Sequence, residues 1–211
     1  MIIAVDGPAA SGKGTIARAL AAHYGLPHLD TGLLYRAVAW RVLQDGGDPE
    51  SESDALAACS FEDAVLSNPA LKGEETGRVA SIVSAHPLVR AALIKRQKSF
   101  AQQPGGAVLD GRDIGTVIAP EADAKLFVTA TPQTRARRRH DEMQKAGSDG
   151  SYDKVLSDIR ARDRRDMARE SAPLAQAADA HLLDTTYLSI DAAVQRAIAL
   201  VDERTGAKPQ G

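Results

Sequence analysis

The sequence is short of several residue types, and each shortage excludes a class of protein. Cys59 is the one cysteine, so the chain cannot form an intramolecular disulfide. Aromatic residues make up 4% of the chain, too few for the stacking platforms that bind single-stranded nucleic acid. The only asparagine, Asn68, is followed by Pro69, so the chain lacks the N-K-x-D motif with which GTPases recognise guanine. A disulfide scaffold, a single-strand binder and a GTPase switch are therefore disfavoured.

The chain also lacks an excess of charge and a long hydrophobic run. Its 26 Lys and Arg residues against 28 Asp and Glu residues give a net charge of −2, so no overall positive field attracts nucleic acid or anionic membranes. No apolar run approaches the roughly 20 residues of a membrane span, and the N-terminus has no secretory signal pattern. We therefore expect a cytoplasmic, monomeric globular protein with no nucleic-acid or membrane partner.

Charge is nevertheless distributed unevenly. Residues 45–63 carry seven acidic residues and no basic one, whereas residues 135–169 carry 11 basic and 7 acidic residues. The basic segment has two interpretations, a solvated helix face or a clamp for a phosphorylated ligand, and its arginine content favours the clamp. An RNA-binding role is the alternative, but the interspersed acidic residues and the scarcity of aromatics count against it.

Short apolar segments alternate with helical patterns along the chain. This alternation predicts an α/β fold with a P-loop NTPase-type core, a five-stranded parallel sheet with helices on both faces. Ligands of such sheets bind beyond the carboxyl ends of the strands. The predicted strands are 1–5, 27–29, 106–109, 124–129 and 181–183; the predicted helices are 13–24, 31–46 with Thr31 as N-cap, 86–100, two Arg-rich helices on either side of 147–150, and a Ser189-capped helix to 204.

A glycine-rich segment between the first strand and the first helix fits the pattern G-x-x-x-x-G-K. Glycines let successive backbone N–H groups converge on phosphate oxygens, and the following helix N-terminus adds partial positive charge. Lys13 would reach the β- and γ-phosphates of a nucleoside triphosphate. The segment therefore predicts an ATP-binding loop made of Gly7, Pro8, Ala9, Ala10, Ser11, Gly12, Lys13, Gly14 and Thr15.

The loop departs from the full P-loop pattern at one position. Gly14 stands where the hydroxyl residue that contacts Mg²⁺ is usual, so Thr15, water or another group must make that contact. Asp110 follows a predicted buried strand, where a carboxylate would polarise a magnesium-bound water. We expect Thr15 and Asp110 to serve the metal, Asp110 through water; a turn or helix-cap aspartate is the alternative for Asp110.

The G-K-G-T end of the loop resembles nucleoside monophosphate kinases more than P-loop GTPases or motor ATPases. Within that group, residues 29–36 (LDTGLLYR) and 110–116 (DGRDIGT) resemble the bacterial-type cytidylate kinase family. The resemblance covers nearly the whole chain, including Ser81, the region of Arg90 and residues 162–166. An adenylate or other small-molecule kinase is the runner-up, but the chain has D-G-R-D where adenylate kinases resemble D-G-F-P-R.

The resemblance implies transfer of the γ-phosphoryl group of ATP to CMP or dCMP with Mg²⁺. It implies that Lys13, Arg112 and Arg162 are catalytic, with Arg112 near the acceptor phosphate and Arg162 at the transferring group. It also implies that Asp113 recognises the base and Asp166 the acceptor ribose. The expected acceptor-binding residues are Thr31, Tyr35, Arg36, Ser81, Arg90, Asp110, Gly111, Arg112, Asp113, Arg162 and Asp166.

Several of these residues also have an explanation from their own chemistry. Arg36 can hold a phosphate as a bidentate fork, or it can be a surface arginine paired with Asp45. Tyr35 is an aromatic residue of a helix, where packing is its usual role. Asp113 as a carboxylate suits the amino group of cytosine, or it only holds Arg112 in place.

The basic segment is expected to form a lid. Arg162, Arg165 and Arg169 are spaced to share one helix face, which by itself indicates a solvated helix but beside a P-loop favours phosphate binding. We expect a single P-loop kinase domain over 1–211, with an acceptor-binding insertion at 45–90 and a mobile lid at 137–150 that excludes water. Arg135, Arg138 and Arg139 precede the break at 147–150, and the sequence leaves open which of them contacts ATP; Arg139 is the candidate selected here. The acidic stretch 45–73 is expected to contribute no core element.

Overall fold

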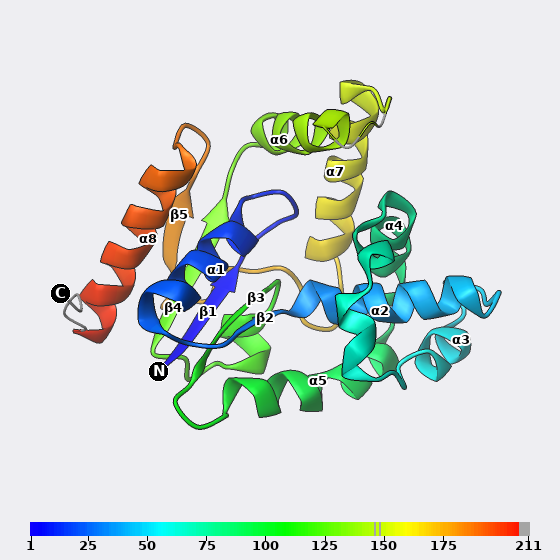
Figure 1. Cartoon of the computed structure of the whole chain (residues 1–211), viewed down its shortest axis with the longest axis horizontal. Coiled ribbons are helices and arrows are strands. Elements are labelled where there is room, and N and C mark those ends of the chain that lie inside the picture. Colours follow the sequence, from blue (N-terminus) through cyan, green and yellow to red (C-terminus); the bar gives the residue numbers. More distant parts are fainter. Residues whose placement is uncertain (146, 148, 207–211) are drawn as a thin grey trace. The chain divides into compact units, whose positions relative to one another are not determined.

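The computed structural model describes residues 1–145, 147 and 149–206. The chain folds as two compact units (Figure 1). The first, called the sheet unit below, comprises residues 1–29 and 101–211; the second, called the helical unit, comprises residues 30–100. The helical unit contains the segment 45–90 and extends beyond it at both ends.

The sheet has five strands in the order β2-β3-β1-β4-β5. Strand β1 pairs in parallel with β3 and β4, and β4 pairs in parallel with β5. The register places Asp6, the last residue of β1, beside Gly111, the last residue of β3. The predicted α/β fold with a five-stranded parallel sheet is confirmed. The strands are β1 (Ile2–Asp6), β2 (His28–Asp30), β3 (Ala107–Gly111), β4 (Ala124–Thr129) and β5 (His181–Asp184).

Helices α1 (Lys13–Tyr24) and α8 (Ile190–Thr205) form the main core with the sheet. Ile16 and Leu20 lie four residues apart and are both buried, as the apolar spacing of this segment predicts. Tyr24 continues the same face and donates its hydroxyl to Asp202 of α8 at 2.7 Å. This packing fixes the start of α1, where the glycine-rich loop ends.

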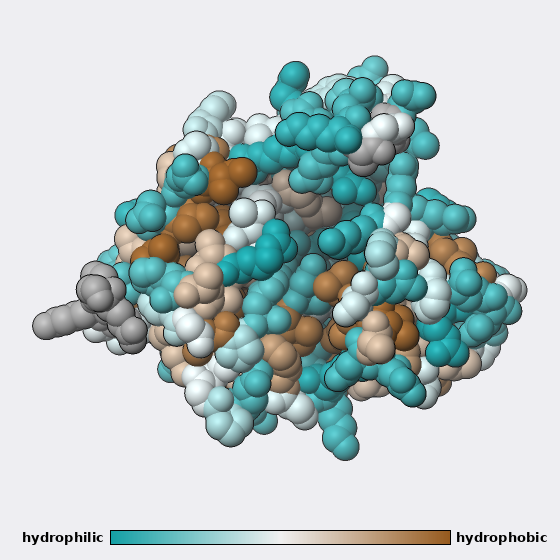
Figure 2. Space-filling model, in the orientation of Figure 1, coloured by the Kyte–Doolittle hydropathy of each residue, from teal (hydrophilic) through white to brown (hydrophobic). Residues whose placement is uncertain are grey.

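Helices α6 (Pro132–Lys145) and α7 (Tyr152–Met167) form the Arg-rich hairpin of the sheet unit. Hydrophilic side chains cover α6 in Figure 2, in keeping with its composition. The predicted break at 147–150 lies between the two helices, although Ser148, like Ala146, lies outside the described residues. Within the described part of the chain, no helix combines the length and the hydrophobicity that a membrane crossing needs.

The helix caps show one error of prediction. Ser189 caps α8 as expected, because its side chain accepts a hydrogen bond from the Ala192 N–H. Thr31 is not the N-cap of α2 (Thr31–Gln44): Asp30 is, accepting from the Gly32 N–H at 2.9 Å. Both residue types are good caps, and the short carboxylate one position earlier has the non-helical backbone that a cap requires.

The helical unit contains more structure than the sequence suggested. Besides α2 it holds α3 (Glu52–Ala57), the short 3₁₀ segments Asp63–Ser67 and Pro69–Lys72, α4 (Glu74–Val83) and α5 (Pro87–Ala101). The expectation that residues 45–73 contribute no core element is wrong, since Ala55 and Leu71 are completely buried. Isolated apolar residues in an acidic segment become core residues once α2 provides a surface to cover.

Helix α4 was not predicted, and its composition explains why. It contains Gly77 and β-branched residues, which lower intrinsic helix propensity. Yet Thr76, Val79 and Val83 are buried and lie three or four residues apart, so one face of α4 packs inward. This spacing was the available signal, and tertiary packing decided the outcome.

Candidate active site

The glycine-rich loop joins β1 to α1 as predicted. A side chain at Gly7 would place its Cβ 2.0 Å from the carbonyl oxygen of Val128, so only glycine fits there. Gly12 is the N-cap of α1 with φ of 90°, a left-handed conformation that favours glycine. The Ser11 hydroxyl is buried and has no hydrogen-bond partner within the described structure. The loop therefore presents a helix N-terminus and an unsatisfied hydroxyl, both suited to an anion.

A cavity of about 560 Å³ lies over this loop within the sheet unit. Arg138 of α6 lines it and donates to the Thr185 carbonyl oxygen at 2.6 Å and to the Thr185 hydroxyl at 3.0 Å. Burial lowers the pKa of Arg138, opposed by the charge of Asp184. Of the two neighbouring arginines, Arg138 lines this cavity and Arg139 is not among its described lining residues. The cavity is also lined by Ala10–Ile16, Arg18, Asp141, Glu142, Lys145, Leu188, Ser189, Ile190 and Ala193.

Asp110 lies at the carboxyl end of β3 and is 2% exposed. One carboxylate oxygen, Oδ2, is 4.0 Å from the Lys13 ammonium nitrogen. The other, Oδ1, is 2.8 Å from Nε2 of His28 at the start of β2. The sheet thus brings the predicted loop lysine and the predicted metal-serving carboxylate together, and it adds a histidine that sequence reasoning did not select.

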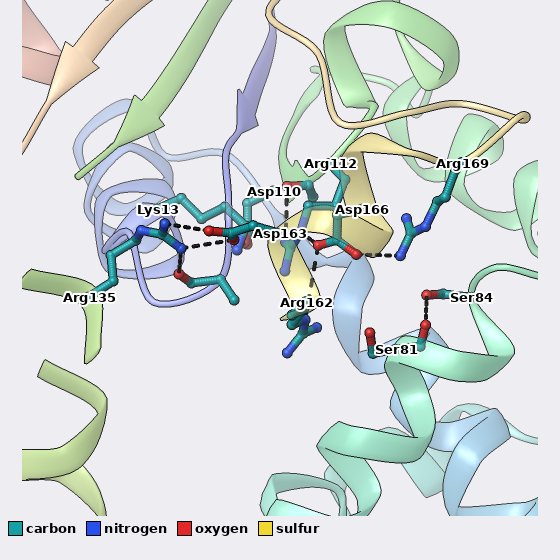
Figure 3. A network of polar contacts seen from close by, with 12 residues as sticks. Lys13, Ser81, Ser84, Asp110, Arg112, Arg135, Arg162, Asp163, Asp166 and Arg169 are labelled. Carbon is teal, nitrogen blue, oxygen red and sulfur yellow. Dashed lines mark hydrogen bonds and ion pairs between the residues drawn. The ribbon is translucent and has the colours of Figure 1, made fainter. Parts of the chain in front are cut away.

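Asp166 of α7 lies among three guanidinium groups (Figure 3). Its carboxylate accepts from Arg112 Nε at 2.8 Å and from Arg169 at 2.6 Å, and lies 4.0 Å from Arg162 Nε. Burial by itself raises the pKa of Asp166. The positive charges of Arg112, Arg169 and Arg162 lower it by more, so the net shift of the pKa is downward. Three of the predicted acceptor-site residues are therefore one charged cluster.

The prediction that Arg169 shares a helix face with Arg162 and Arg165 is wrong. Helix α7 ends at Met167, so Arg169 lies beyond it and turns back to contact Asp166. Its side chain is 7% exposed, whereas Arg165 is exposed. The structure thus makes Arg169 a member of the cluster through its Nη2 contact with Asp166, a role that helical spacing did not reveal.

Asp6 is a second buried carboxylate of the sheet unit. It accepts hydrogen bonds from the backbone N–H groups of Ile114 at 2.8 Å and Gly115 at 2.7 Å. These residues begin the π-helical turn Ile114–Ile118, which follows Arg112 and Asp113 directly. Burial raises the pKa of Asp6 to about 7, against the lowering effect of the two N–H groups. Asp6 therefore fixes the turn that directly follows Arg112 and Asp113.

A buried ion pair links the two helices of the Arg-rich hairpin, and its arginine also contacts the glycine-rich loop. Arg135 of α6 contacts both carboxylate oxygens of Asp163 on α7, at 3.0 and 2.6 Å. The same guanidinium donates to the Ala9 carbonyl oxygen at 3.1 Å. A buried bidentate pair gives geometric specificity, so α6, α7 and the loop are held in one arrangement. Arg135 is a structural member of the hairpin.

Arg36 in the helical unit is held by backbone carbonyl groups. Its Nη1 donates to the oxygen of Leu71 at 2.6 Å and of Gly73 at 3.2 Å. A Cβ at Gly77 would lie 2.8 Å from Arg36 Nη2, so a side chain there would displace this guanidinium from its present position. The alternative pairing with Asp45 is not the one found: Asp45 lies 3.6 Å from Arg41. Arg36 is thus placed by the segment between α3 and α4.

Arg90, Tyr35 and Ser81 also gather within the helical unit. The Arg90 guanidinium lies over the Tyr35 ring, 5.8 Å from its centroid, and donates to the Ser84 carbonyl oxygen at 3.4 Å. Ser84 in turn donates its hydroxyl to the Ser81 carbonyl oxygen at 3.3 Å. Arg90 and Ser81 are both buried, and Thr31 at the start of α2 is buried too. The predicted acceptor residues of this unit are polar groups held inside it by local contacts.

The comparisons with known proteins agree with these motifs. A family model described as cytidylate kinase matches residues 3–203. The cytidylate kinase of Xanthobacter autotrophicus is 59% identical over 204 residues, 97% of this chain and 98% of that protein. That of Rhodopseudomonas palustris is 55% identical over 203 residues, 96% of each chain. The crystal structure of an uncharacterized protein from Eubacterium ventriosum has a TM-score of 0.57 over 97% of this chain and 99% of that one; at 15% identity it supports the fold alone.

Proposed function

The chain belongs to the cytidylate kinase family and transfers a phosphoryl group from ATP to CMP, and we propose how its residues divide that reaction. The juxtaposition of Lys13 with the buried carboxylate of Asp110 at a phosphate-binding loop supports this function most directly. We further propose that dCMP is accepted, that the protein acts as a cytoplasmic monomer, and that it has no nucleic-acid or membrane partner.

The donor phosphates bind the loop from Gly7 to Thr15 in this proposal. The partly positive start of α1, the Lys13 ammonium and the unpartnered Ser11 hydroxyl all favour an anion there. Arg138 lines the cavity and Arg139 lies beside it in sequence, so both are candidates for contact with ATP. The segment 137–150 acts as a lid that excludes water when nucleotide is bound.

Magnesium fits the residues at the loop. Mg²⁺ keeps several waters and is usually bound through one or two carboxylates and the substrate phosphates. Asp110 offers one buried carboxylate and Thr15 a hydroxyl, and no cluster of three or more His, Cys, Asp or Glu side chains that could hold a metal occurs in the described chain. Asp110, through water, and Thr15 would hold the ion, which when bound neutralises charge on the donor phosphates.

The transfer needs no covalent intermediate with the protein. An oxygen of the CMP phosphate attacks the γ-phosphorus in line, the bond to the β-phosphate oxygen breaks, and ADP leaves. Lys13, Arg112 and Arg162 offset the charge that spreads over the equatorial oxygens. Asp166 holds Arg112 by the hydrogen bond at 2.8 Å, which keeps that guanidinium preorganised, and also contacts the acceptor ribose.

The acceptor is recognised by charge at its phosphate and by hydrogen-bond pattern at its base. Arg36, with Thr31, Tyr35 and the backbone of Gly111, is proposed to bind on the acceptor side. Cytosine has an amino donor beside two acceptors, so a carboxylate suits N4 and a guanidinium suits N3 and O2. We assign the first role to Asp113 and the second to Arg90 with Ser81.

A coupled assay of ADP formation tests this function directly. The purified protein is offered ATP with CMP, dCMP, UMP or AMP, and turnover with CMP and dCMP is expected to exceed that with the other two. Lys13→Ala is the control for contaminating kinases, because one preorganised charge contributes roughly 3 to 4 kcal/mol to transition-state stabilisation. Preference for AMP, or full activity of Lys13→Ala, would overturn the assignment.

A further inference from the structure

His28 holds one oxygen of the Asp110 carboxylate on the side away from Lys13. Its Nε2 lies 2.8 Å from Asp110 Oδ1, while the Lys13 ammonium lies 4.0 Å from Oδ2. The two side chains come from neighbouring strands of the sheet, His28 opening β2 and Asp110 near the end of β3. The His28 side chain is 17% exposed and that of Asp110 2%. The contact is therefore largely shielded from water.

The chemistry of the pair sets the direction of its hydrogen bond. A carboxylate accepts hydrogen bonds and donates none, so Nε2 of His28 must carry the proton that lies between them. A carboxylate held through one oxygen cannot rotate freely about its Cβ–Cγ bond. Oδ2 then stays directed at the start of α1, where a Cβ on Gly14 would lie 3.7 Å from it.

We propose that His28 is a positioning residue for the phosphate-transfer site: its Nε2–H group holds Asp110 Oδ1, so that Oδ2 faces the phosphate-binding loop at a set distance from Lys13. This inference rests on the proposed function of Asp110 beside magnesium. Partners in this outer position orient a carboxylate that serves a metal, and losing one typically costs tenfold or more in metal affinity or activity. Without His28 the carboxylate turns toward Lys13, and the closer ion pair withdraws the lysine from the donor phosphates.

The chain offers a matched set of variants. His28→Phe keeps a planar ring and removes the donor, whereas His28→Gln supplies an amide N–H at a similar reach. His181 is the control, because it opens β5, the strand at the opposite edge of the same sheet. Each variant is assayed for turnover against Mg²⁺ concentration and for thermal stability.

The proposal predicts a pattern that loss of packing alone does not produce. His28→Phe should raise the Mg²⁺ concentration for half-maximal turnover roughly tenfold, and His28→Gln should restore it to within about threefold of the wild type. His181→Phe should leave the magnesium dependence unchanged. A lower melting temperature in His28→Phe with an unchanged magnesium dependence would show a structural role only and overturn the proposal.

A second measurement does not depend on activity or on metal. Long-range ¹H–¹⁵N spectra of the histidine rings in metal-free wild-type protein near pH 8 report which ring nitrogen carries the proton. His28 should be in the Nε2–H form, and Asp110→Ala should shift its Nε2 resonance. A neutral His28 protonated on Nδ1 alone would overturn the proposal even if His28→Phe did not fold. If the wild type failed to phosphorylate CMP, the proposed function would fall, while these spectra would still decide the His28 contact.

Discussion

Asp6 and Asp166 are both buried carboxylates of the sheet unit, yet their pKa values move in opposite directions. Burial raises the pKa of Asp6 to about 7, because its hydrogen-bond partners, the N–H groups of Ile114 and Gly115, only partly compensate for lost hydration. Burial also raises the pKa of Asp166, but the guanidinium groups of three arginines reverse the shift. The comparison shows that neighbouring charge, rather than depth, decides whether a buried carboxylate stays ionised.

The same difference separates their effects on stability. Asp6 has a raised pKa in the folded state, so its contribution is fully present below the unfolded value and is lost as the pH rises through about 7. Asp166 has a lowered pKa, so its contribution is present above the unfolded value and is lost as the pH falls. Asp6 positions backbone N–H groups, and its contribution to stability is larger at low pH. Asp166 positions arginine side chains, and its contribution to stability is larger at high pH.

The largest effect is expected when the charge at Asp166 is removed. Asp166→Asn keeps the shape but leaves the cationic groups of Arg112 and Arg169 without their carboxylate, and breaking a buried pair is strongly destabilising. We expect the free energy of unfolding at pH 7.5 to fall by about 3 kcal/mol, the low end of that range because Arg112 and Arg162 are partly exposed. Urea denaturation measures this, and a loss below about 1 kcal/mol would contradict it.

Removing one arginine of the Asp166 cluster should affect catalysis. Arg162→Ala is expected to lower kcat roughly 100-fold, because its contact with the transferring group strengthens in the transition state. Arg36→Ala, in the helical unit, should instead raise the KM for CMP more than that for ATP. Steady-state kinetics with each substrate varied separates the two outcomes, and a change in the ATP KM alone for both variants would contradict the acceptor-side assignment.

The Asp6 side of the comparison is tested by pH. Asp6→Asn removes the titration, so the stability of the wild type minus that of the variant should decline by about 2 kcal/mol between pH 5.5 and 7.5. The sign follows from the raised pKa, since the folded wild type binds a proton that the unfolded chain does not. Thermal or urea unfolding of both proteins at several pH values measures it. A difference that is constant with pH would show that Asp6 is ionised throughout.

Asp113 begins the turn that Asp6 holds, and its charge should govern base choice. Asp113→Asn can rotate its amide to donate to O4 of uracil, so the ratio of kcat/KM for CMP over UMP should fall tenfold or more, roughly 1.4 kcal/mol for one reversed polar contact. If Asp113 only holds Arg112, the two substrates should decline together. An unchanged ratio would therefore remove Asp113 as the residue that recognises the base.

The smallest effect should come from crowding Asp6 without changing its charge. A Cβ at Gly115 would lie 3.1 Å from the Lys125 side chain and 3.4 Å from Asp6 Oδ2. Lys125 is buried and held by Asp179 at 2.8 Å, so it yields little space. Gly115→Ala should therefore destabilise the protein by about 1 kcal/mol at every pH. Urea denaturation at pH 5.5 and 7.5 measures this loss, and a Gly115→Ala variant as stable as the wild type would contradict the prediction.

Local chemistry made much of the protein predictable from sequence. The G-x-x-x-x-G-K segment, the strand periodicity and the Ser189 cap each depend on residues adjacent in the chain, and the structure has the expected elements there. Asp110 at the end of a buried strand was likewise a local inference, and the parallel sheet brings it to Lys13. Roles assigned to acceptor residues remain predictions, because they concern a bound ligand.

What only the tertiary structure decided involves residues far apart in sequence. The contact of His28 with Asp110 spans 82 residues, and the hydrogen bonds of Asp6 to the turn after Asp113 span more than 100. Helix α4 formed despite weak propensity because α2 covers its apolar face, and Arg169 returned to Asp166 because the helix ended before it. Sequence spacing reports periodicity within one element, whereas burial, pKa shifts and the partners of a charge depend on which elements pack together.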